Sequence, residues 1–165
     1  SFLFMPMNGL GQACLPIIGY NYGAKNPDRI QETVKTALKW GIALGLLFTA
    51  LFMALPRQLL SLFNASEEML ALGVPAVRII CVTFALASVT MILGLCASGL
   101  GNGTINMIGT AIRQVVLLLP CFALLKAVFG LQYAWFAMWI AETVAMLFVI
   151  FSTRKEIRRK LKEIQ

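Results

Sequence analysis

Long apolar stretches alternate with short polar ones along the whole chain. Because a helix needs about 20 apolar residues to cross a bilayer, each long stretch is a candidate membrane span. The pattern predicts an all-α integral membrane protein: a polytopic helical bundle made of the end of one span and four full transmembrane helices. The spans are expected at about residues 1–22, 34–55, 74–98, 105–128 and 133–151.

The polar connections carry the signals that begin and end helices. Asp28 follows a proline turn and is predicted to cap the second span. Ser66 precedes two acids and is predicted to cap the helix that leads into the third span. The glycine-rich run at 99–103 and the Phe129-Gly130 pair are expected to break the chain between the later spans.

The last part of the chain changes in character. Residues 1–153 are expected to form the membrane bundle, and residues 154–165 a basic tail. In this tail Ile157, Leu161 and Ile164 recur at helical spacing among basic residues. Such a pattern is typical of an amphipathic helix on the membrane surface that is attracted to anionic lipid. We therefore predict that the tail is a surface anchor.

Composition agrees with a membrane protein. The 165 residues are 59% hydrophobic and 13% charged, with a mean hydropathy of +0.83. A soluble domain is roughly a quarter charged, so this chain cannot coat a soluble globule with polar side chains. The apolar stretches are too numerous for a signal peptide. Since Ser1 already lies inside an apolar run, we expect the sequence to be a fragment cut within a helix.

Basic residues are distributed unevenly between the two ends of the predicted spans. Lysines and arginines number 14, against seven acids, for a net charge of +7. Eleven of the 14 fall on one side of an alternating topology, around residues 20–39, at 99–113 and in the tail. By the positive-inside rule that side is cytoplasmic, so we expect a multi-pass protein of the cell membrane with a cytoplasmic C-terminus. The expected partner of these basic residues is the lipid bilayer and not nucleic acid.

Enzymes and metal sites are disfavoured by the side chains available. Histidine, a common general base and the commonest metal ligand, is absent. The cysteines lie in apolar surroundings without a CxxC pair, and we interpret them as small core residues. They are Cys14, Cys81, Cys96 and Cys121. We expect neither an enzyme nor a metal site.

Glu142 is the acid placed in the middle of a predicted span. Acids at this depth usually face a bundle interior or a water-filled cavity and often serve transport. The alternative is a structural ion pair or a protonated, hydrogen-bonded acid. Arg113 lies at similar depth on the preceding antiparallel span, so it either pairs with Glu142 or extends to the cytoplasmic surface. Arg78 is expected to extend to the outer surface.

Amides near helix ends and prolines inside spans are further candidates. The amides either hold helices together or contact a substrate, and the prolines either bend their helices during transport or form static kinks. The amides are Gln12, Asn21, Asn106 and Gln114, and the prolines are Pro16 and Pro120.

The segment Gly9–Ala24, GLGQACLPIIGYNYGA, is followed by a lysine and a basic loop. It resembles the second-half signature of the multidrug and toxin extrusion (MATE) transporters, and PIIGYNYGAKN is most similar to their MepA-like bacterial branch. Further motifs follow in the family's order and approximate spacing over nearly the whole chain. They are Gly99-Leu100-Gly101, Arg113-Gln114 with Pro120 seven residues on, Phe129-Gly130, Trp135 and Ala141-Glu142.

The resemblance implies an architecture and an activity. MATE transporters have two six-helix lobes, and this chain would supply the end of helix eight and helices nine to twelve, with the N-terminal lobe as its missing partner. Such a protein exports amphipathic, often cationic, organic compounds from bacteria by antiport of H⁺ or Na⁺, through alternating access of its lobes. Apart from the coupling ion, no cofactor is expected.

Three other functions stay open at this point. A lipid-linked oligosaccharide flippase or polysaccharide exporter of the same superfamily would need a more basic cavity. An intramembrane enzyme would need a second catalytic group at depth, and a structural membrane subunit would need none.

For an ion-coupled transporter, the lack of Asp and Glu at residues 79–98 predicts that the principal coupling carboxylate lies in the missing lobe.

Overall fold

The computed structural model describes residues 4–165, and over this range the chain is helical and contains no strand. The all-α fold predicted from the sequence is confirmed, although the first three residues of the predicted span 1–22 lie outside the described range. The elements are α1 (Met5–Gly23), α2 (Pro27–Ala54), α3 (Pro56–Ser61), α4 (Glu67–Cys81), α5 (Phe84–Gly99), α6 (Gly103–Ala111), the π-helical η2 (Ile112–Leu118), α7 (Leu119–Phe129), α8 (Leu131–Ala134) and α9 (Ala137–Ile164).

Several helical stretches are long and apolar enough to cross a membrane. They are Pro27–Ala54, Gly103–Phe129 and Leu131–Ile164, and α4 with α5 makes a fourth if this bent pair forms one span. Large apolar side chains such as Leu47, Leu124 and Leu147 are exposed on these stretches. Exposed apolar surface of this extent is expected where lipid and other membrane helices, and not water, surround a protein.

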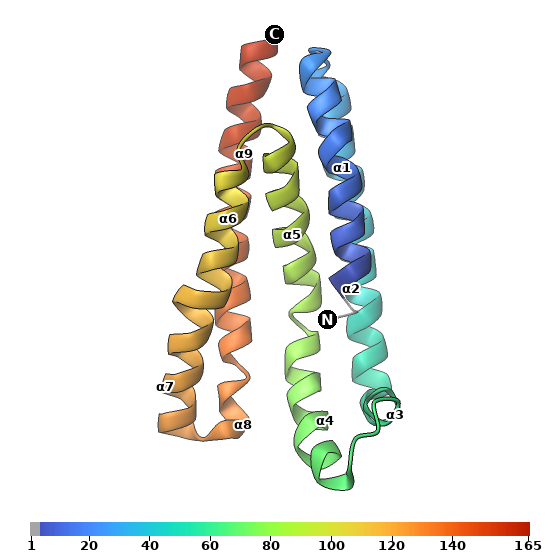
Figure 1. Cartoon of the computed structure of the whole chain (residues 1–165), viewed down its shortest axis with the longest axis vertical. Coiled ribbons are helices and arrows are strands. Elements are labelled where there is room, and N and C mark those ends of the chain that lie inside the picture. Colours follow the sequence, from blue (N-terminus) through green and yellow to red (C-terminus); the bar gives the residue numbers. More distant parts are fainter. Residues whose placement is uncertain (1–3) are drawn as a thin grey trace.

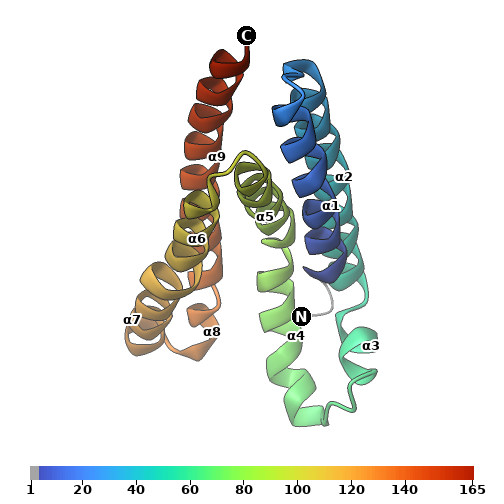
Figure 2. The same cartoon turned by 45° about the horizontal axis from the view of Figure 1, so that its top comes forward.

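The helices run up and down, so their connections gather at two opposite ends (Figure 1). The C-terminus, the α1–α2 turn and the α5–α6 turn lie at one end. The connection between α3 and α4 and the turn between α7 and α8 lie at the other. Figure 2 shows α5 between the α1–α2 pair and the α6–α9 side of the bundle. This is the alternating arrangement on which the charge argument relies.

The central helix is α5, which packs against α1, α2, α6 and α9. Its sequence, FALASVTMILGLCASG, is apolar or small on every face, as expected for a fully buried helix. A Cβ added at Gly45 of α2 would lie 2.7 Å from the Ala85 Cα, and one added at Gly99 would lie 2.9 Å from the Leu15 carbonyl oxygen. Such small residues allow the close backbone approach by which membrane helices pack.

The main core cluster joins α1, α2, α5 and α9. It consists of Cys14, Ile18, Ile30, Val34, Ala37, Ile92, Leu93, Cys96, Leu100 and Val149. Three of the four cysteines are buried and all four are free thiols. Their interpretation as small core residues therefore agrees with the structure for Cys14, Cys81 and Cys96, whereas Cys121 is half-buried.

One predicted helix cap is confirmed and another is wrong. The Ser66 hydroxyl accepts a hydrogen bond of 3.3 Å from the backbone amide three residues later and caps α4. At α2 the cap is Asn26 and not Asp28, and its side-chain oxygen accepts from the amide three residues later, also at 3.3 Å. Pro27 takes the first helical position, where its missing N–H and fixed φ are favourable. The capping residue therefore precedes the proline.

The predicted span at 74–98 is broken in the structure. α4 ends at Cys81 and α5 begins shortly beyond it, with a bend of 51° between the two helices. The Thr49 hydroxyl of α2 donates a hydrogen bond of 2.7 Å to the Cys81 carbonyl, and the Trp139 indole of α9 donates one of 2.5 Å to the Ile79 carbonyl. Neighbouring helices thus satisfy carbonyls that a helix end leaves without intrahelical partners.

The C-terminal tail is helical, as predicted, but it is the end of a longer helix and packs in part on the bundle. α9 continues without interruption through the tail, and Ile157, Leu161 and Ile164 pack against the main core cluster. Tyr22, near the end of α1, donates a hydrogen bond of 3.0 Å to Glu163. The three apolar side chains of the tail are half-buried, so protein covers only part of its apolar face.

Candidate functional site

The helical stretch that follows α5 contains a widened turn, the π-helical segment η2. Pro120 lies two residues beyond it, and proline both lacks an N–H and clashes with the carbonyl four residues earlier, at Val116. Regular α-helical bonding therefore fails just before Pro120. The sequence predicted a bend or a kink at this proline, and the structure has a widened turn before it. Such turns often occur at functional sites, and this one carries Arg113 and Gln114.

Arg113 of η2 and Glu142 of α9 form an ion pair. Nη1 of Arg113 lies 3.5 Å from Oε1 of Glu142, and the side chains are 17% and 4% exposed. The sequence left open whether Arg113 pairs with Glu142 or extends to the surface, and the structure has the pair. At 3.5 Å the contact is longer than an ordinary N–H···O hydrogen bond, so the attraction is mainly electrostatic.

The second carboxylate oxygen of Glu142 is left without a partner. Oε2 is buried and accepts no hydrogen bond from any residue in the described range 4–165. A buried polar group without a partner costs on the order of 1–3 kcal/mol. A proton, a cation or a ligand donor at this oxygen would remove that cost.

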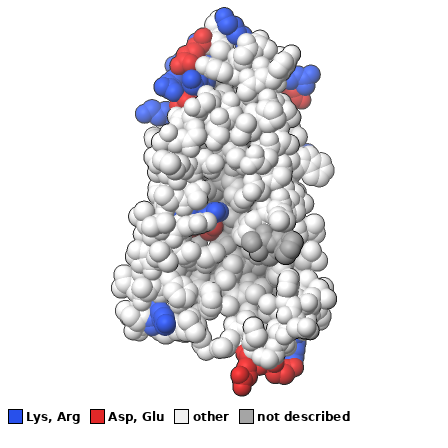
Figure 3. Space-filling view, in the orientation of Figure 1, with Lys and Arg blue, Asp and Glu red and all other residues white. Residues whose placement is uncertain are grey.

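A cavity of about 410 Å³ opens beside the ion pair. It is lined by Phe4, Arg113, Gln114, Leu118, Met138, Ala141 and Glu142. Aromatic, thioether and aliphatic walls with a few polar groups are typical of sites for small amphipathic molecules. Figure 3 shows charged side chains gathered mainly at the two ends of the molecule, and blue and red atoms side by side in a hollow near mid-height.

The other predicted candidates are not all brought to this cavity. Gln114 lines it, whereas Gln12 is exposed on α1. Asn21 donates a hydrogen bond of 2.8 Å to a backbone carbonyl of its own helix, and Asn106 lies against α5. α1 runs through Pro16 as a single helix. The structure therefore groups Glu142, Arg113 and Gln114 and separates them from Gln12 and Asn21.

Sequence reasoning missed the apolar walls of the cavity. Phe4, Leu118 and Met138 give no chemical signal among so many apolar residues. Met138 and Leu118 had a usable clue, because they lie four positions from Glu142 and Gln114, respectively, and residues at this spacing share a helix face.

A family model described as MatE matches residues 1–123 of this chain. Among curated proteins, the multidrug export protein MepA of Staphylococcus haemolyticus (strain JCSC1435) is 24% identical over 157 residues, which cover 90% of this chain and 33% of that protein. MepA of Staphylococcus aureus (strain MW2) is also 24% identical, over 144 residues that cover 84% of this chain and 30% of that protein. The chain thus spans about a third of the length of these relatives.

Solved structures share the fold. The MATE multidrug transporter DinF-BH, solved as a complex, is 33% identical with a TM-score of 0.84, covering 93% of this chain and 34% of that one. An inward-facing MATE family transporter of the MOP superfamily has a TM-score of 0.89 at 22% identity, covering 98% of this chain and 38% of that one. The bent form of VcmN from Vibrio cholerae has a TM-score of 0.86 at 19% identity, covering 96% and 37%.

Proposed function

Because this chain belongs to the MatE family of multidrug and toxin extrusion transporters, we propose that the protein containing it exports amphipathic organic compounds by cation antiport. The chain would act as part of one lobe in a bacterial plasma membrane, with a cytoplasmic C-terminus. The observation that carries the proposal is Glu142, a buried acid beside a cavity, with one oxygen near Arg113 and the other unpartnered.

The surroundings of Glu142 favour a proton over Na⁺ as the ion taken up in this lobe. Hard metal cations need several oxygen ligands, and the lining side chains offer only the carboxylate and the Gln114 amide. The guanidinium of Arg113, 3.5 Å from Oε1, would repel a metal cation. A proton needs one oxygen, and Oε2 is unpartnered.

Protonation would then act through the ion pair. Two unit charges 3.5 Å apart attract by roughly 5 kcal/mol at an effective dielectric constant of about 20, before desolvation is subtracted. Conformations that interconvert in function differ by a few kcal/mol, so loss of this attraction is large enough to shift such a balance. Release of Arg113 would free η2 to move against α9, at a turn where the helical bonding is already irregular.

Glu142 is proposed as a supporting carboxylate and not as the principal one. Residues 79–98 contain no acid, and a desolvated cation needs a compensating charge. The principal coupling carboxylate is therefore assigned to the part of the protein outside this chain. This lobe would contribute the cavity, the widened turn and one titrating pair.

An amphipathic cation fits the cavity better than a phosphorylated lipid does. Phe4, Met138 and Leu118 offer apolar contact, and the unpartnered Glu142 oxygen offers negative charge. Two relatives bear on the substrate class: MepA is named a multidrug export protein, and DinF-BH a multidrug transporter. The arginine of the cavity is already paired with Glu142, so an oligosaccharide-lipid flippase, which needs excess positive charge, is not favoured.

Reconstitution of the whole protein tests the proposal. Proteoliposomes loaded with a fluorescent organic cation would be given a pH gradient, a Na⁺ gradient or neither. We expect the pH gradient to drive dye movement and a protonophore to abolish it. Dye movement that follows neither gradient would contradict the proposed antiport, and movement driven only by Na⁺ would contradict the proton assignment.

A further inference from the structure

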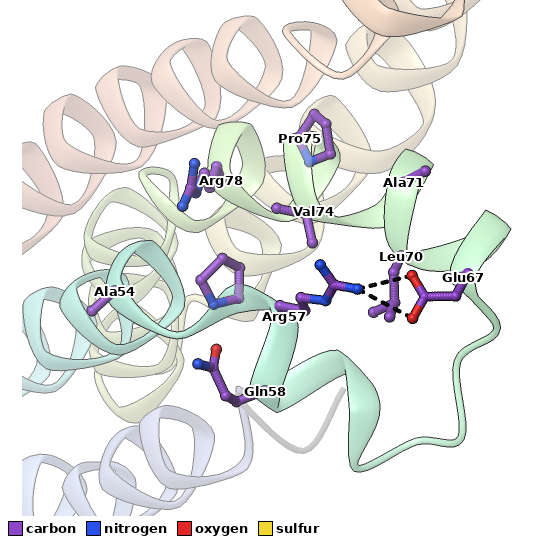
Figure 4. Close-up of a pocket in the computed structure, with 10 residues that line it drawn as sticks. Ala54, Arg57, Gln58, Glu67, Leu70, Ala71, Val74, Pro75 and Arg78 are labelled. Atoms are coloured by element: carbon purple, nitrogen blue, oxygen red, sulfur yellow. Dashed lines mark hydrogen bonds and ion pairs between the residues drawn. The ribbon is translucent and has the colours of Figure 1, made fainter.

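A second cleft lies at the end of the bundle opposite the C-terminus. It opens between the ends of α2 and α3 on one side and α4 on the other (Figure 4), with a volume of about 570 Å³. Two arginines line it, Arg57 from α3 and Arg78 from α4, together with a single carboxylate, Glu67. The side chains that line this cleft therefore carry one excess positive charge.

Arg57 has only part of its hydrogen-bonding capacity in use. Its Nη2 donates to both oxygens of Glu67, at 2.8 and 3.1 Å. Nη1 and Nε donate to no atom within the described part of the chain. A guanidinium offers five N–H donors, so most of the donors of Arg57 stay available while its Nη2 binds Glu67.

Arg78 has no carboxylate partner among residues 4–165. It stands in the last turn of α4, and its side chain lines the same cleft from the α4 side (Figure 4). The sequence predicted that Arg78 extends toward the outer surface, and in the structure it is exposed in this cleft. An arginine in a membrane segment usually pairs with another charged residue or with backbone carbonyls, and no acid in the described part of the chain pairs with Arg78.

Most of the other side chains that line the cleft are apolar. Leu70 and Val74 line it from α4, and Figure 4 shows Val74 pointing toward Arg57. Beside it on the same helix, Met69 and Leu72 are 63% and 65% exposed. The cleft thus joins unpaired guanidinium donors to apolar side chains of α4. A small hydrophilic anion would use only the first of these features, whereas an amphiphile uses both.

We propose that this cleft binds the phosphodiester group of a phospholipid from the leaflet at this end of the bundle. Arg78 and the free donors of Arg57 would hold the phosphate oxygens, because guanidinium groups match phosphate geometry. The glycerol backbone and the start of an acyl chain would lie against Leu70 and Val74. A lipid held there would contact both α3 and α4, and would so stabilise the position of α4 in the broken span.

Native mass spectrometry of the whole protein with added phosphatidylglycerol tests this site. Arg78→Gln removes the unpaired charge, and Val74→Phe fills the cleft while leaving both arginines in place. Lys126→Gln is the matched control, because Lys126 is an exposed cation at the same end of the bundle and lies outside the cleft. We expect both cleft variants to bind one phosphatidylglycerol about tenfold or more weakly, and the control to bind as wild type does.

Two further probes separate the possible sources of the anion. Diacylglycerol has the same chains without the phosphate, and glycerol phosphate has the anion without the chains. The proposal expects weak binding of both. Equal affinity for glycerol phosphate would show a site for soluble anions, equal affinity for diacylglycerol would show an apolar groove only, and wild-type lipid binding by Arg78→Gln and Val74→Phe would show no site. Each of these results overturns the proposal.

Discussion

Trp139 on α9 donates its indole N–H to the backbone carbonyl of Ile79 on α4, with a distance of 2.5 Å between the nitrogen and the oxygen. Trp139 precedes Glu142 by three residues, so this bond and the ion pair to Arg113 lie about one turn apart on α9. The last helix therefore holds the broken span and the widened η2 turn at nearly the same height. Movement of α9 would affect both elements together.

Trp139→Phe tests the bond to the broken span. Phenylalanine keeps a large ring but has no N–H, so the Ile79 carbonyl loses its partner. We expect a loss of about 1 kcal/mol in stability and faster amide hydrogen exchange at residues 79–83. Trp135→Phe is the matched control, because Trp135 packs against Phe122 with ring centroids 5.6 Å apart. Equal effects of the two substitutions on exchange at the break would contradict the role of the indole N–H.

The Arg113–Glu142 pair predicts an unequal effect of two neutralisations. Arg113→Gln leaves the more buried Glu142 as an uncompensated charge, which typically costs about 3–5 kcal/mol. Glu142→Gln leaves Arg113, which is more exposed and can reorient, so the loss should be smaller. Combining both changes should recover stability relative to Arg113→Gln alone. Thermal unfolding in detergent measures this, and a double variant no more stable than Arg113→Gln would show that the pair does not matter.

Gly45 is predicted to be a packing requirement of the α2–α5 contact. A Cβ there would lie 2.7 Å from a backbone atom, the Ala85 Cα, which cannot move as a flexible side chain can. We expect Gly45→Ala to destabilise the protein by about 1–3 kcal/mol. Gly9→Ala is the control, because nothing lies within 4 Å of a Cβ at Gly9. Unfolding temperatures that fall equally in both variants would contradict the close approach.

The charge bias predicts the sidedness of the bundle. Single cysteines at Asn26 and Gln165, both exposed near the basic end, should resist an impermeant thiol reagent in intact cells. A cysteine at Ser66, at the opposite end, should react. The background would lack the four native cysteines. Labelling at Asn26 from outside would reverse the assigned topology.

The sequence was sufficient for the fold class because hydropathy and charge are summed over many residues. The family resemblance also rested on motifs spread along the chain, and the match to residues 1–123 confirms it. Ser66 was predicted correctly because a cap is a local interaction. The predicted cap at Asp28 was wrong because two polar residues, one on each side of Pro27, compete for one cap, and the proline at the first helical position favours Asn26.

The break in the third predicted span was beyond local reasoning. No glycine or proline marks residues 82–83. The hydrogen bonds that satisfy the exposed carbonyls come from Thr49 and Trp139, which are distant in sequence. The packing of the tail was also beyond local reasoning. Its amphipathic pattern was correct, but its apolar residues pack in part against a core cluster that includes residues distant in sequence. For the candidate site, Pro120 marked the disturbed helix, whereas the π-helical turn and the unpartnered Glu142 oxygen required three-dimensional placement.

We propose that Glu142 supports transport through its ion pair with Arg113, which would be lost when Glu142 takes up a proton. The most direct measurement is dye efflux by the whole protein in proteoliposomes under imposed H⁺ and Na⁺ gradients. Wild type is compared with Glu142→Gln, after the Glu142→Gln protein has been shown to bind the dye. We expect slower efflux that still responds to the pH gradient, because the principal coupling carboxylate is proposed to lie outside this chain. Wild-type efflux would leave Glu142 without a role. Residual efflux that responds to neither gradient would place the principal coupling site in this chain and contradict its assignment to the other part of the protein.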